Sequence, residues 1–223
     1  MTTVISEAPV ITTAEPINLE DLVDRLGGIA LSRILAQPAP GIATEADLIE
    51  ATRRYGRLYE LVDGVLVEKG MGFGESLLAC ALIQILRNFV IPRNLGIVSG
   101  PDGTIRLFSG LTRIPDVTFA SWDRFPDRRI PEEPIPSLAP DLVIEVLSES
   151  NTRAEMERKR SEYFATGVNL IWEFDPRARV VMVYAQDGSS SRLDASQSLD
   201  GGNVLPGFAL NIGEVFAELD RHG

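Results

Sequence analysis

The chain has 223 residues, and its 32 acidic and 21 basic side chains give a formal net charge of −11 at pH 7. This charge disfavours nucleic acid as a partner, although it still allows a local basic patch. One cysteine, Cys80, excludes an internal disulfide, and one histidine, His222, excludes a Cys/His zinc site or a Ser-His-Asp device. Any catalysis must therefore use carboxylates, lysine, tyrosine or an oxygen-bound metal ion.

The first segment, residues 1–16, has neither a basic stretch nor a long apolar core, so it is predicted to be disordered and not a signal peptide. No run reaches the ~18 apolar residues that span a bilayer. We therefore expect a cytoplasmic protein without membrane contact. Apolar residues at helical spacing predict short helices over 18–26 and from Thr44, which together form a helical extension over 17–54.

The remaining residues, 55–223, are predicted to form one domain of alternating strands and helices. Asp63-Gly64 between two β-prone runs indicates a hairpin, and Thr152-x-x-Glu155 indicates a helix that ends at Gly167. The predicted strands cover 58–62, 65–68, 95–99, 104–108, 113–120, 140–148, 170–174, 180–184 and 208–212, and the predicted helices cover 75–90, 152–166 and a short turn from Gly213. This order predicts a mixed α+β fold with a central mixed sheet flanked by helices.

Glu145 is the most informative residue, because it interrupts the apolar strand Pro-Asp-Leu-Val-Ile-Glu-Val-Leu-Ser at 140–148. A carboxylate in such a strand is costly to desolvate unless a cation or hydrogen bonds compensate. The alternative is a structural pair with an arginine. The functional interpretation is that Glu145 binds a metal ion.

Two further residues complete a chemical set with Glu145. Asp116 lies at the entry of a predicted strand, and Lys159 lies at the margin of the inward face of the following helix. Two carboxylates on adjacent strands can hold one Mg²⁺ or Mn²⁺, which activates water and polarises a phosphoryl oxygen. A lysine adds positive charge where the transition state becomes more negative. Asp116 could instead be a solvent-facing acid, and Lys159 a lysine that extends to solvent.

Short motifs over roughly residues 55 to 185 strengthen this interpretation. They are Tyr-Glu-Leu-Val-Asp-Gly at 59–64, Pro-Asp-Val at 115–117, the strand at 140–148 with Asn151, Lys-Arg-Ser-Glu-Tyr at 159–163, Gly-Val at 167–168 and Ile-Trp at 171–172. Together they resemble the Uma family of restriction-endonuclease-like proteins within the PD-(D/E)XK nuclease superfamily. The resemblance implies a restriction-endonuclease-like core, with Asp116 and Glu145 as the metal-binding acids.

The resemblance also assigns Lys159 as the catalytic lysine, supplied from the helix. The superfamily pattern places this lysine two residues after the second acid, where this chain has Leu147. Three further candidates are a third acid at Glu60, an acid on the first large helix at Glu75, and a phosphate donor at Tyr163. Each also has a structural interpretation: an outward strand residue, a charge near a helix N-terminus and core packing, respectively.

The resulting expectation is a Mg²⁺- or Mn²⁺-dependent endonuclease that hydrolyses DNA with metal-activated water. The alternative is a catalytically inactive nuclease-fold module for binding or assembly, favoured by the net charge and the displaced lysine. A two-carboxylate glycosidase is disfavoured by the small number of aromatic residues. The superfamily resemblance and the extra N-terminal segment predict a homodimer.

Overall fold

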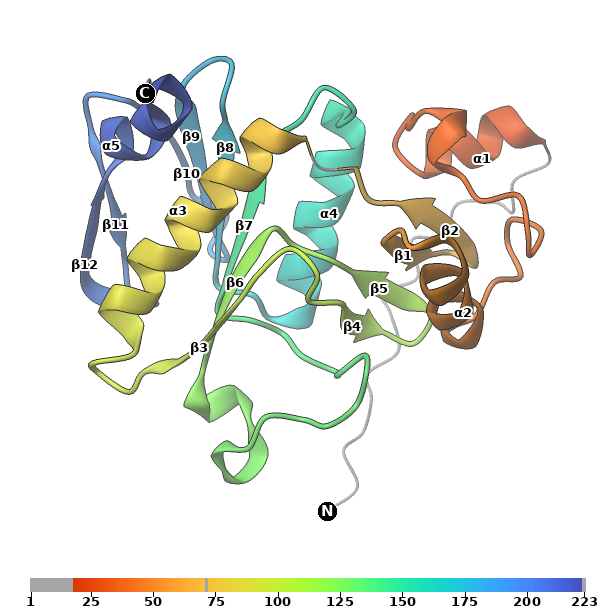
Figure 1. Ribbon diagram of the computed structural model, residues 1–223, viewed down its shortest axis with the longest axis horizontal. Helices are drawn as coiled ribbons and strands as arrows, with labels where there is room; N and C mark the ends of the chain where they lie inside the picture. Colours follow the sequence, from red (N-terminus) through yellow and green to blue (C-terminus); the bar gives the residue numbers. More distant parts are fainter. Residues whose placement is uncertain (1–17, 71, 222–223) are drawn as a thin grey trace.

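A mixed sheet of six strands forms the centre of the fold in the computed structural model, which describes residues 18–70 and 72–221 (Figure 1). The strand order is β10-β9-β8-β7-β6-β3. The strands are β3 (Gly96–Ser99), β6 (Val117–Ser121), β7 (Leu142–Val146), β8 (Leu170–Asp175), β9 (Val180–Ala185) and β10 (Ser190–Asp194). Within this sheet β7 and β8 run parallel, and every other neighbouring pair is antiparallel.

Two helices cover the opposite faces of this sheet. α3 (Phe73–Val90) contributes Leu82 to a large apolar core that also contains Ile144 of β7 and Trp172 of β8. α4 (Arg153–Thr166) contributes Tyr163 to a second cluster with Val143, on the other face of β7. Because side chains alternate along a strand, Glu145 shares the face of Val143 and lies under α4.

The ends of α4 are fixed by residues that the sequence identifies. Thr152 Oγ1 accepts a 3.0 Å hydrogen bond from the Glu155 backbone N–H, and Gly167 ends the helix with a φ of 96°. The predicted capping box forms only in part, because the carboxylate of Glu155 pairs with Arg33 at 2.8 Å. The helix start is thereby tied to the N-terminal segment.

The N-terminal segment packs on the hairpin that follows it. The elements of this region are α1 (Leu19–Arg25), η1 (Leu31–Arg33), α2 (Glu45–Tyr55), β1 (Tyr59–Val62) and β2 (Val65–Glu68). Asp63 and Gly64 both have positive φ, as a tight two-residue hairpin turn requires. One apolar cluster joins Leu48 of α2 to Leu61 of β1, and another joins Leu22 of α1 to Val65 of β2. The extension thus buries part of its apolar surface within the chain, while Leu19, Leu31 and Ile42 stay exposed, and the homodimer stays a prediction.

The predicted strand over 113–120 is wrong in one respect, because it is two strands. β5 (Leu111–Arg113) pairs with β4 (Ile105–Phe108) in a separate two-stranded sheet, and β6 begins only at Val117. Pro115 lies between them and has no N–H to donate to a ladder. The break places Asp116 at the beginning of β6, beside the central strand β7.

The C-terminal region contains more strands than the sequence predicts. β12 (Leu205–Asn211) and α5 (Ile212–Phe216) lie where the sequence predicts a strand and a short helix, whereas β10 and β11 (Ser198–Gly201) are not predicted. β10 is mostly exposed, so the apolar alternation that marks a half-buried strand is missing. Three short 3₁₀ turns complete the chain: η2 (Trp122–Arg124), η3 (Pro126–Arg128) and η4 (Ala217–Asp220). The predicted disordered start at 1–16 and His222 lie outside the described residues.

α3 is the one helix in the described part of the chain that is long and apolar enough, by length and composition alone, to cross a membrane. Its inner face is buried against the sheet through residues such as Leu78 and Leu86. One face of α3 therefore belongs to the core of the fold. Its outer face still exposes Phe73 and Leu77.

Candidate active site

Asp116 and Glu145 lie next to each other on the face of the sheet that α4 covers. Val117 of β6 pairs with Ile144 of β7 in antiparallel register, so the preceding and following residues, Asp116 and Glu145, are adjacent across the two strands. Both side chains are buried, with residue exposures of 4% and 5%. The structure therefore brings the two predicted acids together in a site away from bulk water.

Lys159 reaches the same place from α4. Its Nζ lies 3.5 Å from Glu145 Oε1 and 3.2 Å from Glu60 Oε1, and the residue is 4% exposed. Tyr163, one turn further along α4, donates a 2.6 Å hydrogen bond to Glu145 Oε1. Four of the candidate residues from the sequence thus meet Asp116 in one buried cluster.

Glu60 belongs to this cluster and is not an outward strand residue. Its carboxylate forms a 2.7 Å salt bridge with Arg113 Nη1 and accepts a 3.0 Å hydrogen bond from the Ile114 backbone N–H. Arg113 also pairs with Glu162 of α4 at 2.6 Å. A buried chain of alternating charges therefore links β1, β5 and α4, and it fixes the position of Lys159 at Glu60.

Lys69 is a member of the cluster that the sequence analysis does not identify. Its Nζ lies 2.7 Å from Asp116 Oδ1 and also donates to the backbone carbonyl of Ile114. The other oxygen, Asp116 Oδ2, accepts a 2.7 Å hydrogen bond from the Val146 backbone N–H. The composition carries a signal for this residue: among 21 basic residues the chain has only two lysines, Lys69 and Lys159, and both contact the paired acids.

The cluster shifts the proton affinities of its members in opposite directions. Burial raises the pKa of Glu145, and it is opposed by Lys159 and reinforced by Asp116. Burial alone would also raise the pKa of Glu60, but the charges of Lys159 and Arg113 hold it well below the usual range. Burial would lower the pKa of Lys159, yet Glu145 and Glu60 raise it, so this lysine stays charged. The pKa values of Glu145 and Glu60 are therefore moved apart, and Glu145 takes up a proton more readily than Glu60.

Glu75 lies apart from the cluster. It occupies the first turn of α3, is half-buried, and turns its carboxylate back towards Gly72 at the start of the helix. This position is that of a favourable charge near a helix N-terminus. Among the contacts described for the buried cluster, none involves Glu75.

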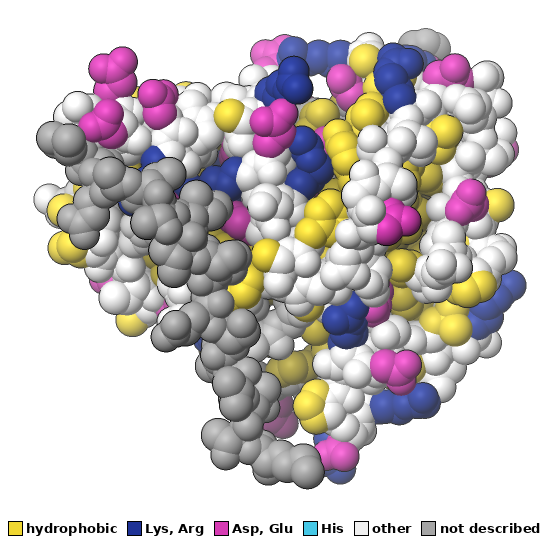
Figure 2. Space-filling view, turned by 180° about the vertical axis from the view of Figure 1, so that it is seen from behind, with side chains coloured by type: hydrophobic (Ala, Val, Ile, Leu, Met, Phe, Trp, Pro, Cys, Tyr) yellow, Lys and Arg dark blue, Asp and Glu magenta, His cyan; other side chains and the backbone are white. Residues whose placement is uncertain are grey.

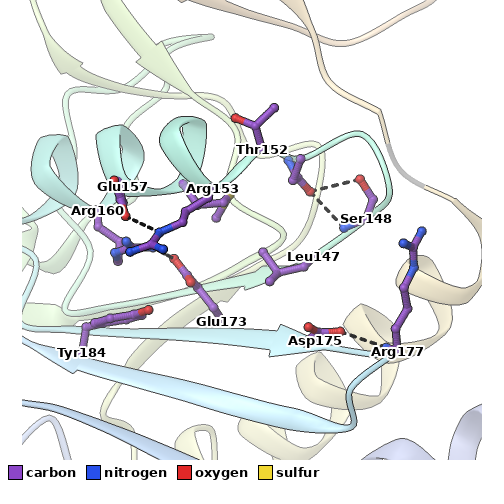
Figure 3. Close-up of a pocket in the computed structure, with 12 residues that line it drawn as sticks. Leu147, Ser148, Thr152, Arg153, Glu157, Arg160, Glu173, Asp175, Arg177 and Tyr184 are labelled. Atoms are coloured by element: carbon purple, nitrogen blue, oxygen red, sulfur yellow. Dashed lines mark hydrogen bonds and ion pairs between the residues drawn. The ribbon is translucent and has the colours of Figure 1, made fainter. Parts of the chain in front are cut away.

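An open cavity of about 460 Å³ lies beside the cluster, between α4 and the strands β8 and β9 (Figure 3). Its wall includes Leu147, two residues after Glu145, and Arg160, the residue after Lys159. Arg160 pairs at 2.7 Å with Glu173, which is the register partner of Glu145 on the parallel strand β8. The cavity thus approaches the cluster from one side, while the paired acids themselves stay buried.

A mixed sheet flanked by helices, with two acids adjacent on its central strands, agrees with the restriction-endonuclease-like fold that the sequence resemblance implies. The family model Uma2, described as "Putative restriction endonuclease", matches residues 47–213. The chain therefore belongs to the Uma2 family. The match begins within α2, inside the predicted N-terminal extension.

One solved structure with a similar fold is described as a putative nuclease belonging to DUF820 from Anabaena variabilis ATCC 29413. It has 21% sequence identity to this chain and a TM-score of 0.65, and the match covers 74% of this chain and 92% of that one. No curated protein matches the chain. The predicted family and the predicted fold class are both confirmed, and the fold is nuclease-like.

Proposed function

We propose that this protein is a divalent-metal-dependent phosphodiesterase that cleaves DNA as an endonuclease. The observation that carries the proposal is the convergence of Lys159 on Glu145, at 3.5 Å, beside the adjacent acid Asp116. Membership of the Uma2 family supports the same conclusion.

The donor set suits a hard divalent ion. Asp116 and Glu145 would hold Mg²⁺ or Mn²⁺ through carboxylate oxygens, the ligands that such ions prefer. Within the described residues there is no ready-made group of three or more acidic, histidine or cysteine side chains for a metal. Two carboxylates with solvent ligands are nevertheless sufficient for Mg²⁺, which commonly keeps several waters. When bound, the ion would lower the pKa of a water and polarise a phosphoryl oxygen.

The residues around the acids would orient the groups and supply charge. The Val146 N–H fixes one oxygen of Asp116, and the Tyr163 hydroxyl fixes one oxygen of Glu145. Lys159 would stabilise the negative charge that develops on a phosphoryl group in the transition state. Glu60 holds the Lys159 ammonium in place at 3.2 Å, so the charge is positioned before the reaction begins.

Cleavage of supercoiled plasmid in Mg²⁺ or Mn²⁺ tests the proposal. Glu145→Gln should abolish cleavage, because it removes a carboxylate charge with little change in volume. Glu173→Gln is the matched control: it is also a buried glutamate, on the neighbouring strand, but it pairs with Arg160 outside the cluster. The control should retain activity within about threefold, a small change in barrier on the scale of 1.4 kcal/mol per tenfold. Equal cleavage by the wild-type protein and Glu145→Gln would overturn the proposal.

A binding or assembly module is the second candidate, and the burial of the cluster favours it. Asp116, Glu145 and Lys159 are each exposed by 5% or less, so a phosphodiester reaches them only if neighbouring groups move. Basic side chains on the face shown in Figure 2 alternate with acidic ones over the described residues, without an extended basic surface. No plasmid cleavage under any divalent ion, by a protein that circular dichroism shows to be folded, would support this candidate.

A further inference from the structure

Lys69 is the second ammonium of the cluster, and the proposed function gives it no role. It follows β2 directly, and its Nζ lies 2.7 Å from Asp116 Oδ1 while also donating to the Ile114 carbonyl. Lys69 and Lys159 are lysines, and the other residues among the 21 Lys and Arg side chains are all arginines. Lysine differs from arginine in offering a compact single charge on a flexible four-carbon stem. The choice of lysine at position 69 therefore has a physical consequence.

The two oxygens of Asp116 are not equivalent. Oδ2 accepts the Val146 N–H at 2.7 Å, which fixes the carboxylate and uses that oxygen within β7. Oδ1 is the oxygen left for a metal ion, and the Lys69 ammonium lies on it. A divalent cation at Oδ1 would face a positive charge at contact distance, and like charges at such distances repel strongly in a buried site.

The two lysines differ in how firmly they are held. Lys159 extends from the middle of α4 and lies between Glu60 and Glu145, and the residue is 4% exposed. The Lys69 side chain is 7% exposed, close to the 5% of Lys159, but Lys69 lies outside any helix or strand and is followed directly by the exposed Gly70. Lys69 contacts a single carboxylate and can turn towards the exposed Gly70 by rotating its four-carbon stem, whereas Lys159 is held between two carboxylates.

We infer that Lys69 is a displaceable internal counter-cation, which occupies the metal-facing oxygen of Asp116 and leaves it when a divalent ion binds. The inference rests on the proposed metal-dependent function. It explains why each acid of the buried pair has its own lysine, because an ammonium offsets the cost of a buried carboxylate. It also makes Lys69 a positioning residue that sets the metal concentration the site requires.

Calorimetric titration of the full chain with Mn²⁺ is the first test. Lys69→Met removes the competing charge at similar length, so the Kd for Mn²⁺ should fall by about tenfold or more. Lys69→Arg keeps the charge and should bind within about threefold of wild type. Arg57→Met is the matched control, because it removes a neighbouring surface cation that pairs with Glu68 and not with Asp116. This control should leave the Kd unchanged.

Acylation of the wild-type chain is the second test, and it does not depend on the stability of a variant. The chain has two lysines, so mass spectrometry can follow each one. Saturating Mg²⁺ should raise the acylation rate of Lys69 by about fivefold or more, because the side chain moves to solvent, and should leave that of Lys159 unchanged.

The outcomes separate this inference from the proposed function. If wild type and Lys69→Met bind Mn²⁺ equally well, or if Lys69 acylation does not respond to Mg²⁺, Lys69 is not a displaceable cation, while the metal-dependent function stands. If neither wild type nor Lys69→Met binds Mn²⁺, both the inference and the metal-dependent function fail.

Discussion

The Tyr163 hydroxyl donates a 2.6 Å hydrogen bond to Glu145 Oε1, the same oxygen that lies 3.5 Å from Lys159 Nζ. Tyr163 and Lys159 are one turn apart on α4, so a single helix face presents two donors to one carboxylate oxygen. This arrangement fixes the orientation of Glu145 before any ligand arrives. It also makes the position of α4 over the sheet decisive for the site.

Tyr163→Phe tests this orientation. Loss of the hydroxyl leaves a buried carboxylate oxygen with one donor fewer, so the free energy of unfolding should fall by about 1–2 kcal/mol. Plasmid cleavage should fall by about tenfold, because Glu145 is less well positioned. Tyr184→Phe is the control, since Tyr184 hydrogen-bonds Glu173 outside the cluster. Equal effects of both substitutions on cleavage would contradict the role given to Tyr163.

Arg113 should be the most sensitive charged residue for stability. It is buried and bridges Glu60 and Glu162 at 2.7 and 2.6 Å. Arg113→Met leaves two buried carboxylates short of their cation, so chemical denaturation should show a loss of about 3–5 kcal/mol. Arg53→Met removes an arginine that pairs with Glu50 but is 75% exposed. Arg53→Met should lower the free energy of unfolding by less than about 0.5 kcal/mol. A similar loss in both variants would contradict the role of Arg113 in stability.

The sequence predicts the paired acids because their signals are local. Glu145 interrupts an apolar strand, and Asp116 follows Pro115 at a strand entry, so each residue is unusual within a few positions. The register of β6 and β7 then makes them neighbours. The face of α4 is harder to assign, because its buried side includes Glu155 and Glu162 as well as Met156. A helix with a charged inner face gives no clear apolar stripe.

The remaining members of the cluster depend on contacts between distant parts of the chain. Arg113 and Glu162 meet across 49 residues, and Lys69 and Asp116 across 47 positions of the numbering (116 − 69). Neither Arg113 nor Lys69 is unusual in its local sequence, since a charged residue at the end of a strand is common. The scarcity of lysine in the whole chain is the one composition signal for Lys69, and its partner emerges only from the fold.

Glu60→Gln should change how stability depends on pH. Although burial would raise the pKa of Glu60, Lys159 and Arg113 lower it below the ordinary 4.5 of glutamate. Its ionised form therefore stabilises the fold at neutral pH, and this contribution is lost only as the pH falls below about 4.5. The free energy of unfolding of the wild type should exceed that of Glu60→Gln by about 3 kcal/mol at pH 7. Urea denaturation should show a difference that is constant from pH 7 to 5 and shrinks below that; a difference that grows on acidification would contradict the assignment.

Gly27→Ala tests whether the N-terminal segment is fixed to the helix that carries Lys159. A Cβ at Gly27 would lie 2.5 Å from the Glu155 backbone nitrogen at the start of α4. Gly28 also has a positive φ, 70° against 91° for Gly27, but a Cβ there meets no atom within 4 Å. Both substitutions carry the backbone cost of a left-handed conformation, about 1 kcal/mol, so their difference isolates the steric contact.

We expect the free energy of unfolding of Gly27→Ala to be about 1–3 kcal/mol lower than that of Gly28→Ala, because the clash forces the segment away from α4. The same displacement strains the salt bridge of Arg33 with Glu155 and the hydrogen bond from Arg158 to the Arg25 carbonyl. Both contacts hold the first half of α4, so Gly27→Ala should also weaken cleavage more than Gly28→Ala does. Equal stability of the two variants would show that residues before α2 fold independently of the site.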